Sequence, residues 1–586
     1  DNKLLKKMRL NNIYGVAISG SDSANYYLTN TAFSASNGVI LPKAVTLAPQ
    51  AVSKTYDGSA TIAATNTDLG VLTSQLGIAG DMVTGVTLTY DNKNAGTNKT
   101  LIASNALISD GNNGSNYAIS YQNNTASEIT RATLTVTGST VTTKAYDGAV
   151  AAAITGGTLV GVVGSDQVVL AQSGLFTNAH AASSIPVTAT DTLSGLQANN
   201  YALIQPTGLT GTIIPKTVSV NGTVVADKTY SGTTDATIAT LGSIQGLVGT
   251  ETLGLNGIAT FGTANAGTNK SVSLNYTLSN GSGLASNYTL PSATTTATIN
   301  RAALVVKANN DTRLIAQGDA FNYNGVNYTG LVNGETSAVL GGTLSVARSN
   351  TAQNAAASYN GVLVPSGLTS NNYSITYQTG NYTILPAEQV LVRVNNVEQN
   401  YGSSLTLAPL SVQYLSNGSV LTTLTQTSAS NNTYTYNDGL GGSVSFTLTP
   451  ANPVTSTSGS LAVGNYTVTG SGISAGGNNF IGTPVFSGEI SILKSALTPS
   501  TSQVSKTYDG SASMGTVTVQ FVGVVTQGGA SDLVRSTGAG LYATKNAGSN
   551  IAYTVTGLSL TGADAGNYYI AGGTTFTGNN GVITPK

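Results

Sequence analysis

Short runs in which apolar and polar residues alternate recur along the whole chain. Val86-Thr87-Leu88-Thr89-Tyr90 and Ala132-Thr133-Leu134-Thr135-Val136 are two of them. Glycine and asparagine turns separate such runs about every 8 to 12 residues, which is typical of half-buried strands in a β-sandwich. A helical period of 3.6 is not sustained over about 11 residues with capping residues anywhere in the chain. The pattern therefore predicts an all-β fold.

A pentapeptide divides these strands into repeats. Lys54-Thr55-Tyr56-Asp57-Gly58 returns at 144–148, 228–232 and 506–510, with Ala145 and Ser231 as its two substitutions. The first three tyrosines are 90 and 84 residues apart (146 − 56 and 230 − 146), which is the size of one small all-β domain. We predict a tandem array of about six small β-sandwich domains of the immunoglobulin-like kind. A β-grasp-like fold is the second choice, since a helical stretch in each repeat, for example near 69–76, stays open.

We name the segments by their order. Residues 1–43 are interpreted as the end of a preceding repeat. They are followed by repeat one (44–131), repeat two (132–216), repeat three (217–301), repeat four (302–386), repeat five (387–493) and repeat six (494–586). Repeat four lacks the opening signature, and repeat five has Asn400-Tyr401-Gly402 in its place. Because the chain starts within one repeat and stops on another repeat's closing strand, we expect a fragment of a longer protein at both ends.

Charge is scarce in this chain. Charged residues make up 8% of it, against about 25% in an ordinary soluble domain. Its 23 basic and 24 acidic residues leave a net charge of −1, which argues against nucleic acid and against an anionic membrane surface as partners. A polar surface with so little self-repulsion also favours self-association.

Cysteine is absent, so disulfides and thiolate metal sites are excluded. The absence fits a bacterial exported protein. No apolar run approaches the ~20 residues of a membrane-spanning helix, so we expect no membrane span in this fragment. The basic start with Lys3, Lys6, Lys7 and Arg9 is followed by an alternating run at 13–18 and is not interpreted as a signal peptide.

The recurring residues are interpreted as structural. In Tyr-Asp-Gly, glycine accepts a positive φ and aspartate accepts a local backbone hydrogen bond, which predicts a turn below a buried tyrosine ring. An Asn-Tyr pair late in every repeat resembles a tyrosine corner, whose hydroxyl bonds back to a loop. An Asn-Ala-Gly segment predicts a tight turn with a left-handed glycine. The signature residues are Tyr56, Asp57, Gly58, Tyr117, Tyr146, Asp147, Gly148, Tyr201, Tyr230, Gly232, Tyr288, Tyr373, Tyr466, Tyr508, Asp509, Gly510 and Tyr568.

Catalysis is poorly supported by the sequence. The single histidine, His180, stands where other repeats have the turn glycine, and we expect an exposed loop residue without a catalytic role. No metal-ligand or phosphate-binding pattern is present, so we predict no catalytic residues, no metal and no cofactor. Two less favoured alternatives remain: a sugar or calcium contact at Tyr-Asp-Gly, and an isopeptide bond between a signature lysine such as Lys54 and a turn asparagine such as Asn94.

The pentapeptide, the Asn-Ala-Gly-Thr-Asn-Lys segments at 94–99 and 265–270, and the Asn-Tyr pairs resemble the YDG-type repeats of large bacterial surface proteins. Repeats four and five are similar to the related MBG repeats, and Tyr401-Gly402 supplies their Tyr-Gly opening in repeat five. The resemblance implies a secreted, haemagglutinin-like adhesin at the bacterial cell surface or in the extracellular matrix. It implies no catalytic or ligand residues.

We therefore expect a structural stalk or filament that supports adhesion, aggregation or a biofilm matrix. Almost no linker separates the repeats, and proline at Pro42, Pro215 or Pro386 stiffens the connection. The alternative is direct binding of glycan, mucin or another cell-surface receptor by the repeats. Homo-polymerisation by head-to-tail or edge-strand contacts is a further expectation.

Overall fold

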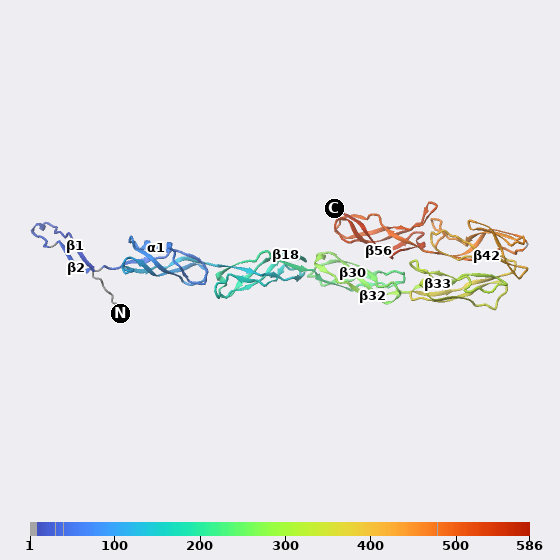
Figure 1. The fold of residues 1–586 in the computed structure, drawn as a ribbon, viewed down its shortest axis with the longest axis horizontal. Coiled ribbons are helices and arrows are strands. Elements are labelled where there is room, and N and C mark those ends of the chain that lie inside the picture. The colour runs from blue at the N-terminus through green and yellow to red at the C-terminus, as the bar shows by residue number, and fades with distance from the viewer. Residues whose placement is uncertain (1–8, 30, 39, 478) are drawn as a thin grey trace. The chain divides into compact units, whose positions relative to one another are not determined.

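A computed structural model describes residues 9–29, 31–38, 40–477 and 479–586. The basic residues Lys3, Lys6 and Lys7 lie outside the described residues. The fold is all-β, as the alternation predicts, and forms a tandem array of β-sandwich repeats (Figure 1). Two compact units contain them: unit one (1–217, 248–251 and 283–289) and unit two (218–247, 252–282 and 290–586). Over the described ranges, no helix has the length and apolar character needed to cross a membrane.

Unit one begins with the antiparallel pair β1 (Arg9–Tyr14) and β2 (Ala32–Gly38). Repeat one then pairs its first strand, β3 (Lys43–Leu47), in parallel with β8 (Tyr117–Tyr121). Its larger sheet has the order β4-β9-β7-β6-β5. The bounds are β4 (Ser53–Thr55), β9 (Asn124–Thr130), β7 (Gly96–Ser109), β6 (Met82–Tyr90) and β5 (Thr61–Ile62).

Repeat two has the same plan, with a three-stranded sheet in the order β15-β10-β20 and a five-stranded sheet in the order β12-β21-β18-β17-β13. The first sheet holds β15 (Thr158–Val160), β10 (Ala132–Thr137) and β20 (Tyr201–Ile204). The second holds β12 (Lys144–Ala145), β21 (Thr210–Ile214), β18 (Ala182–Ala189), β17 (Gly174–Phe176) and β13 (Ala151–Ala152). Short pairs complete it: β11 (Thr140–Val141) with β14 (Ile154–Thr155), and β16 (Val169–Ala171) with β19 (Thr192–Ser194). Unit one ends in the parallel pair β22 (Lys216–Thr217) and β31 (Tyr288–Thr289).

Helix α1 (Asn66–Leu76) in repeat one is the α-helix of the described residues. It starts in a capping box, because the Thr65 side chain accepts from the Asp68 amide while the Asp68 carboxylate accepts from the Thr65 amide. Gly77 ends it in the left-handed conformation at φ 65°. Leu72 and Leu76 are fully buried against the first strand. The helix left open by the sequence near 69–76 therefore exists in repeat one.

Unit two begins with repeat three, whose five-stranded sheet has the order β25-β32-β30-β29-β26. Its strands are β25 (Lys228–Thr229), β32 (Ala293–Asn300), β30 (Gly267–Asn280), β29 (Leu253–Phe261) and β26 (Asp235–Ala236). Two short pairs flank it: β23 (Ser219–Asn221) with β28 (Ser243–Gln245), and β24 (Val224–Val225) with β27 (Ile238–Thr240).

Repeat four has a three-stranded sheet in the order β35-β33-β38 and a four-stranded sheet in the order β34-β39-β37-β36. The first contains β35 (Val326–Thr329), β33 (Ala302–Ala308) and β38 (Tyr373–Gln378). The second contains β34 (Asp311–Leu314), β39 (Gly380–Leu385), β37 (Ala357–Thr369) and β36 (Gly341–Arg348).

Repeat five has the larger sheet order β41-β49-β47-β46-β45-β44, beside a sheet of order β43-β42-β40-β48. The larger sheet contains β41 (Val397–Asn400), β49 (Glu489–Leu493), β47 (Gly464–Gly476), β46 (Ser443–Pro450), β45 (Thr433–Asn437) and β44 (Thr425–Ser430). The other contains β43 (Val420–Thr423), β42 (Pro409–Ser416), β40 (Leu391–Val394) and β48 (Val485–Ser487).

Repeat six forms one seven-stranded sheet in the order β51-β58-β56-β55-β52-β50-β57. Its strands are β51 (Ser505–Thr507), β58 (Phe576–Thr584), β56 (Gly548–Thr561), β55 (Arg535–Tyr542), β52 (Ser513–Val522), β50 (Ser495–Ser500) and β57 (Tyr568–Ile570). The short hairpin β53 (Thr526–Gln527) and β54 (Ala530–Ser531) lies outside that sheet.

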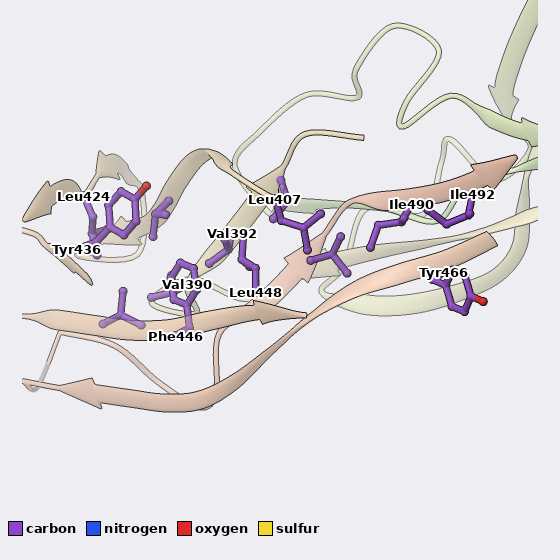
Figure 2. Packing of buried hydrophobic residues seen from close by; sticks show 14 of the residues in the cluster. Val390, Val392, Leu407, Leu424, Tyr436, Phe446, Leu448, Tyr466, Ile490 and Ile492 are labelled. Atoms are coloured by element: carbon purple, nitrogen blue, oxygen red, sulfur yellow. The ribbon is translucent and has the colours of Figure 1, made fainter. Parts of the chain in front are cut away.

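Alternating side chains of these strands form the cores. In repeat five, Val390, Val392, Phe446 and Leu448 gather with Tyr436 between the strands (Figure 2). Phe446 packs on the Tyr436 ring at 6.0 Å between ring centroids with an interplanar angle of 6°. Burial of such apolar surface is the main stabilising contribution available to a chain without cysteine.

One residue separates the last strand of a repeat from the first strand of the next at four connections. These single residues are Arg131, Pro215, Arg301 and Lys494. The fourth-to-fifth connection is longer, because β39 ends at Leu385 and β40 begins at Leu391. At four of the five connections between repeats one and six, the structure thus has the near absence of linkers that the sequence predicts.

Candidate functional site: the joints between repeats

The signature tyrosine sits above a turn built as the sequence predicts. In repeat one, Gly58 has a φ of 79°, and the Asp57 carboxylate accepts from the Ser59 amide at 2.9 Å. Tyr56 is 3% exposed, and its amide donates to the carbonyl of Thr130 at the end of the repeat's last strand. The turn therefore holds the tyrosine ring at the end of its repeat.

The signature lysine fastens this turn. Lys54 Nζ donates to Asp57 Oδ1 at 2.7 Å and to the carbonyls of Ser59 and Thr61 at 2.7 and 3.0 Å. In the same sheet, Lys54 Nζ lies 5.8 Å from the centroid of the Tyr90 ring. Lys144 and Lys506 form the same ion pairs with Asp147 and Asp509.

Repeat three lacks the signature carboxylate because Ser231 stands in its place. Lys228 bonds the carbonyls of Thr233 and Asp235 at 2.8 and 2.9 Å. Burial lowers the pKa of Lys228 from its usual value, and the charge of Asp235 opposes this shift. In all four pentapeptides, the signature lysine thus donates hydrogen bonds to two backbone carbonyls of the turn.

The hydroxyl of the signature tyrosine reaches into the next repeat. Tyr56 Oη donates to Asp166 Oδ2 at 2.7 Å, and Tyr201 Oη donates to the same oxygen at 2.6 Å. The two rings meet edge to face, with centroids 5.4 Å apart and an interplanar angle of 79°. A half-buried carboxylate therefore accepts one phenol from each of two consecutive repeats, an arrangement that we call the Tyr–carboxylate–Tyr joint.

The same joint occurs four times, each time within one compact unit. Its members are Tyr56, Asp166 and Tyr201; Tyr146, Glu251 and Tyr288; Tyr230, Glu335 and Tyr373; and Tyr401, Asp532 and Tyr568. The ring centroids of the tyrosine pairs are 5.2 to 5.4 Å apart, and all four pairs are edge to face. The four joints coincide with the four one-residue connections.

A short loop presents each joint carboxylate. In repeat two, the Asp166 amide donates to the Val163 carbonyl at 3.1 Å, and the Val163 amide donates to Tyr201 Oη at 3.0 Å. The hydroxyl of Tyr201 is thus acceptor from the loop and donor to the carboxylate, which fixes both groups. The predicted tyrosine corner does bond back to a loop, but to one far upstream.

Sequence reasoning missed the joint carboxylates. They are aspartate in two joints and glutamate in the other two, and their partner in the preceding repeat lies 105 to 131 residues away. A signal was present, however. An acidic residue stands 35 to 38 residues before the tyrosine of the Asn-Tyr pair in each joint, from 201 − 166 to 373 − 335.

The asparagine of the Asn-Tyr pair makes a second contact across each joint. Asn200 Oδ1 accepts from the Ala95 amide of the preceding repeat at 2.9 Å, and Asn200 Nδ2 donates to Asn94 Oδ1 at 3.2 Å. Asn287, Asn372 and Asn567 accept in the same way from the amides of Ala181, Ala266 and Val463. An Asn-Ala-Gly segment supplies this amide in two of the four joints, and Ala181 and Val463 supply it in the other two.

His180 belongs to one of these contacts. Its Nδ1 lies 3.2 Å from Asn287 Nδ2, where Asn94 and Asn265 supply an amide oxygen in other joints. The side chain is exposed, as the sequence predicts. His180 therefore holds the position of Asn94, not the turn-glycine position that the sequence predicted, and its partner is a joint asparagine.

Apolar packing continues through the joints. One buried cluster joins Leu88 and Leu101 of repeat one to Leu134 of repeat two, with Tyr56 and Tyr201 between them. A Cβ built on Gly58 would lie 3.1 Å from Val163 Cγ1, so the turn glycine packs directly on the loop that presents the carboxylate. Buried clusters also include the tyrosine pairs of the third and fourth joints, so these three joints are small extensions of the core rather than surface contacts.

Burial and the carboxylate together change the titration of the joint tyrosines. Burial first, and then the hydrogen bond to Asp166, raise the pKa of Tyr56 to about 12. The pKa values of Tyr146 and Tyr230 are also raised to about 12 by the same two causes. Burial acts to raise the pKa of Asp532, but hydrogen bonds from Tyr401 and Tyr568 outweigh it and hold that pKa below its usual value.

Comparison with protein families places these residues in a known repeat. The YDG domain model matches residues 41–126, 130–208, 214–297 and 493–575, which together exceed half of the chain. This chain belongs to the YDG domain family. The model for the MBG domain of the YGX type matches residues 304–383, within repeat four. The resemblance to YDG and MBG repeats seen in the sequence is thus confirmed, while the assignment of repeat five to the MBG type stays a prediction.

Two further comparisons add little to this assignment. No curated protein matches the chain. Among solved structures, the crystal structure of Drosophila N-cadherin EC1-4 is 8% identical and is covered completely by 77% of this chain, with a TM-score of 0.11. A similarity of that size supports no inference about this protein.

The connection between the MBG repeat and repeat five is built differently. Arg393 Nη1 donates to Asp311 Oδ1 at 2.9 Å, and Arg393 also bonds the carbonyl of Thr312. Asp311 is 1% exposed, and its pKa is raised by burial despite the charge of Arg393. No signature tyrosine precedes this connection in repeat four, so an ion pair takes the place of the tyrosine pair.

Two predictions about signature segments are wrong. Gly96 and Gly548 of the Asn-Ala-Gly segments do not have a positive φ, and Gly267 is nearly extended at 158°. The left-handed residues are Asn98, Asn269 and Asn550, with φ of 51° to 55°, at a bulge two residues further on. In repeat one β6 ends at Tyr90 and β7 begins at Gly96, so the turn lies before the glycine and the left-handed asparagine lies within the strand.

Tyr466 is also not an equivalent of the other Asn-Tyr tyrosines. It lies in β47, and its hydroxyl donates to the carbonyl of Ala462, four residues away. The strand beside the first strand of repeat five is β48, which contains Phe486 in place of a tyrosine. The Asn465-Tyr466 pair therefore recurs in sequence but not in position.

The remaining signature residues occupy less complete sites. Tyr117 donates to Asp81 Oδ2 at 2.6 Å within repeat one. Tyr508 is half-buried above the turn that contains Asp509 and Gly510.

The partners of an isopeptide bond are not brought together in repeat one. Lys54 Nζ donates to Asp57 and to two backbone carbonyls, whereas Asn94 accepts from Asn200.

Proposed function

We propose that this chain is the structural stalk of a secreted bacterial cell-surface protein, and that it supports adhesion, aggregation or a biofilm matrix. YDG and MBG repeats fit the repeat region of a surface protein. The observation that supports a stalk is the Tyr–carboxylate–Tyr joint, which occurs at four connections with one-residue linkers. The proposal includes no catalytic step.

Joints of this kind suit a load-bearing role. A flexible linker allows consecutive domains to rotate freely. Here three features oppose that rotation. They are the carboxylate that accepts from two phenols, the hydrogen bond from a backbone amide to the asparagine, and the continuous apolar cluster. Charge-assisted hydrogen bonds are the strong ones, and burial of the tyrosine rings excludes water from them.

The signature residues already form hydrogen bonds within the protein, and these bonds use the groups that a ligand would need. The Tyr56 hydroxyl, the Asp57 carboxylate and the Lys54 ammonium all have partners within the protein. Direct binding of glycan by Tyr-Asp-Gly would require these bonds to break. The alternative of direct glycan or receptor binding therefore depends on other surfaces.

Electron microscopy of the purified chain tests the stalk. We compare the wild type with a variant in which the four joint carboxylates are replaced by alanine, at Asp166, Glu251, Glu335 and Asp532. Wild-type particles should show a fixed angle between consecutive repeats at each of the four joints, and the variant should show variable angles. Equal variability in both proteins would contradict the proposal, and glycan-array binding that is lost on mutation of exposed aromatics would favour the alternative.

A further inference from the structure

The larger sheet of repeat five ends in an edge strand that is long and fully exposed. Strand β44 (Thr425–Ser430) pairs with β45 on one side, and no strand of the described residues pairs with it on the other. All six of its side chains are exposed. We propose that β44 pairs in antiparallel orientation with β44 of a second copy of this chain, so that two chains associate side by side at repeat five. This inference rests on the proposed function, because copies of a stalk on one surface or in one matrix lie close together.

The sheets of the four YDG repeats avoid such an edge. The outermost strands of their larger sheets are two or three residues long. They are β4 and β5, β12 and β13, β25 and β26, and β51 and β57. Very short edge strands are one means by which proteins prevent pairing with other chains. Repeat five does not use this means at β44.

Repeat four has a long edge strand too, but a side chain covers it. The outermost strand β36 runs for eight residues. Asn322 Oδ1 accepts from the Val346 amide at 3.0 Å, and Asn322 Nδ2 donates to the Leu344 carbonyl at 3.5 Å. Asn322 therefore occupies backbone groups that β36 would need to pair with a further strand. Within the part of the chain that the structure describes, no side chain bonds to the backbone of β44 in this way.

The composition of β44 also favours pairing. No charged residue lies anywhere in 399–437. Lysine and proline are the residues that discourage pairing at an edge, and β44 contains neither. It has one bulge, between Gln426 and Ser428, which increases its twist. The ladder is regular again from Ser428 to Ser430, so the strand keeps an edge on which hydrogen bonds to another strand can form.

A second copy is the partner that this strand fits. Two identical strands pair in antiparallel orientation about a two-fold axis, so each presents the surface that the other needs. In one such register, Thr425 lies opposite Ser430 and Gln426 lies opposite Ala429, and opposed threonine and serine side chains stabilise a strand pair. A net charge of −1 gives almost no repulsion between the chains. Because the contact is small and polar, the association should be weak and should depend on concentration.

Sedimentation velocity of the full chain from about 10 μM to about 1 mM tests the proposal, since this range covers a weak contact. The wild type should shift from monomer to dimer and form nothing larger, because the pair uses the edge of both chains. A Lys variant (Thr425→Lys with Ser430→Lys) and a Glu variant (Thr425→Glu with Ser430→Glu) should each stay monomeric, because like charges then oppose each other. An equimolar mixture of the two should form dimers, since Lys then faces Glu. Both positions are exposed, so both variants should fold.

Ser271→Lys with Ser273→Lys is the matched control. These exposed residues lie in β30, which pairs with a strand on each side, so the same charge is added away from any edge. The control should dimerise like the wild type. Association that persists in the Lys variant would overturn the inference, as would a wild type that stays monomeric throughout or a mixture that forms no dimer.

Hydrogen exchange of the same samples separates this inference from the proposed function. The amides of 425–430 report on the strand pair and should gain protection as the concentration rises, whereas those of Val163 and Asp166 report on a joint. Protection at Val163 and Asp166 in a chain that never dimerises would refute the strand pair and leave the stalk intact. Unprotected amides there, in a chain that does dimerise through 425–430, would refute the stalk and leave the strand pair intact.

Discussion

Removal of a single joint hydroxyl should loosen one joint and leave the rest of the chain unchanged. In Tyr56→Phe the ring remains, so its burial and its edge-to-face contact with Tyr201 remain too. The variant loses the 2.7 Å hydrogen bond to Asp166, whose carboxylate keeps the bond from Tyr201. A hydrogen bond to a charged group contributes about 1.5 to 3 kcal/mol, so the joint should open roughly 10- to 150-fold more often.

Hydrogen exchange with mass spectrometry measures that opening on the full chain. The amides of Val163 and Asp166 report on the joint, because they bond Tyr201 Oη and the Val163 carbonyl. Protection of these two amides should fall roughly 10- to 150-fold. The equivalent loop of the joint between repeats three and four, at 332–335, serves as the reference within the same molecule. Tyr90→Phe is the matched control, since its hydroxyl bonds the carbonyls of Val52 and Glu128 inside repeat one.

Two results would refute this reasoning. Unchanged protection at 163–166 in Tyr56→Phe would mean that the hydroxyl does not hold the joint. An equal loss at 332–335, or the same loss at 163–166 in Tyr90→Phe, would mean that the variant acts on the whole fold rather than on one joint.

Three further predictions concern pH and the remaining connection. The pKa values of Tyr56, Tyr146 and Tyr230 in the folded protein are about 12, above the usual 10. Their contribution to stability is therefore complete below pH 10 and is lost as the pH rises to 12. Circular dichroism from pH 8 to 12 should show unfolding, and a matched salt titration at pH 8 should not. Burial raises the pKa of Glu489 from 4.5 to about 7, so the free energy of unfolding should fall by up to roughly 3 kcal/mol between pH 5 and 8; urea titrations of Glu489→Gln should show a smaller fall, and an identical fall would contradict the assignment. Arg393→Ala leaves the carboxylate of Asp311, 1% exposed, without its ion pair, and should cost about 3 to 5 kcal/mol of stability in repeat four; a urea midpoint equal to that of the wild type would contradict it.

The sequence predicts the strands well because each repeat buries one face of its sheets locally. Alternation at 86–90 and 132–136 gave strands β6 and β10, and Asp57-Gly58 gave the turn with its positive φ. Helix α1 was left open, although its capping box of Thr65 and Asp68 is also a local feature. These features depend on residues close together in the chain.

The joints could be predicted only in part, because they depend on residues of different repeats. The sequence identifies Tyr56 and Tyr201 as recurring residues but predicts for each of them a role inside its own repeat. Their shared partner, Asp166, is 110 residues from Tyr56, and glutamate takes its place in two other joints. These groups come together because a one-residue linker joins the two repeats, and the alternation within each repeat does not show this contact.

The Asn465-Tyr466 pair shows that a recurring dipeptide alone does not predict a joint. The dipeptide matches the others in sequence, yet β47 carries it on a strand that pairs with β46 and β49. The tyrosine then lies beside Ala462 instead of a carboxylate. A short motif fixes a function only together with the strand that presents it.

The distance between consecutive repeats is the measurement that tests the central claim most directly. Since the chain has no cysteine, Thr87→Cys and Thr188→Cys place spin labels only on two exposed strand positions, one in repeat one and one in repeat two. Pulsed electron resonance on this pair should give one narrow distance distribution, and the distribution should broaden when Asp166→Ala is added. A broad distribution in both proteins, or a narrow one that survives loss of the carboxylate, would contradict joints held by Tyr56, Asp166 and Tyr201.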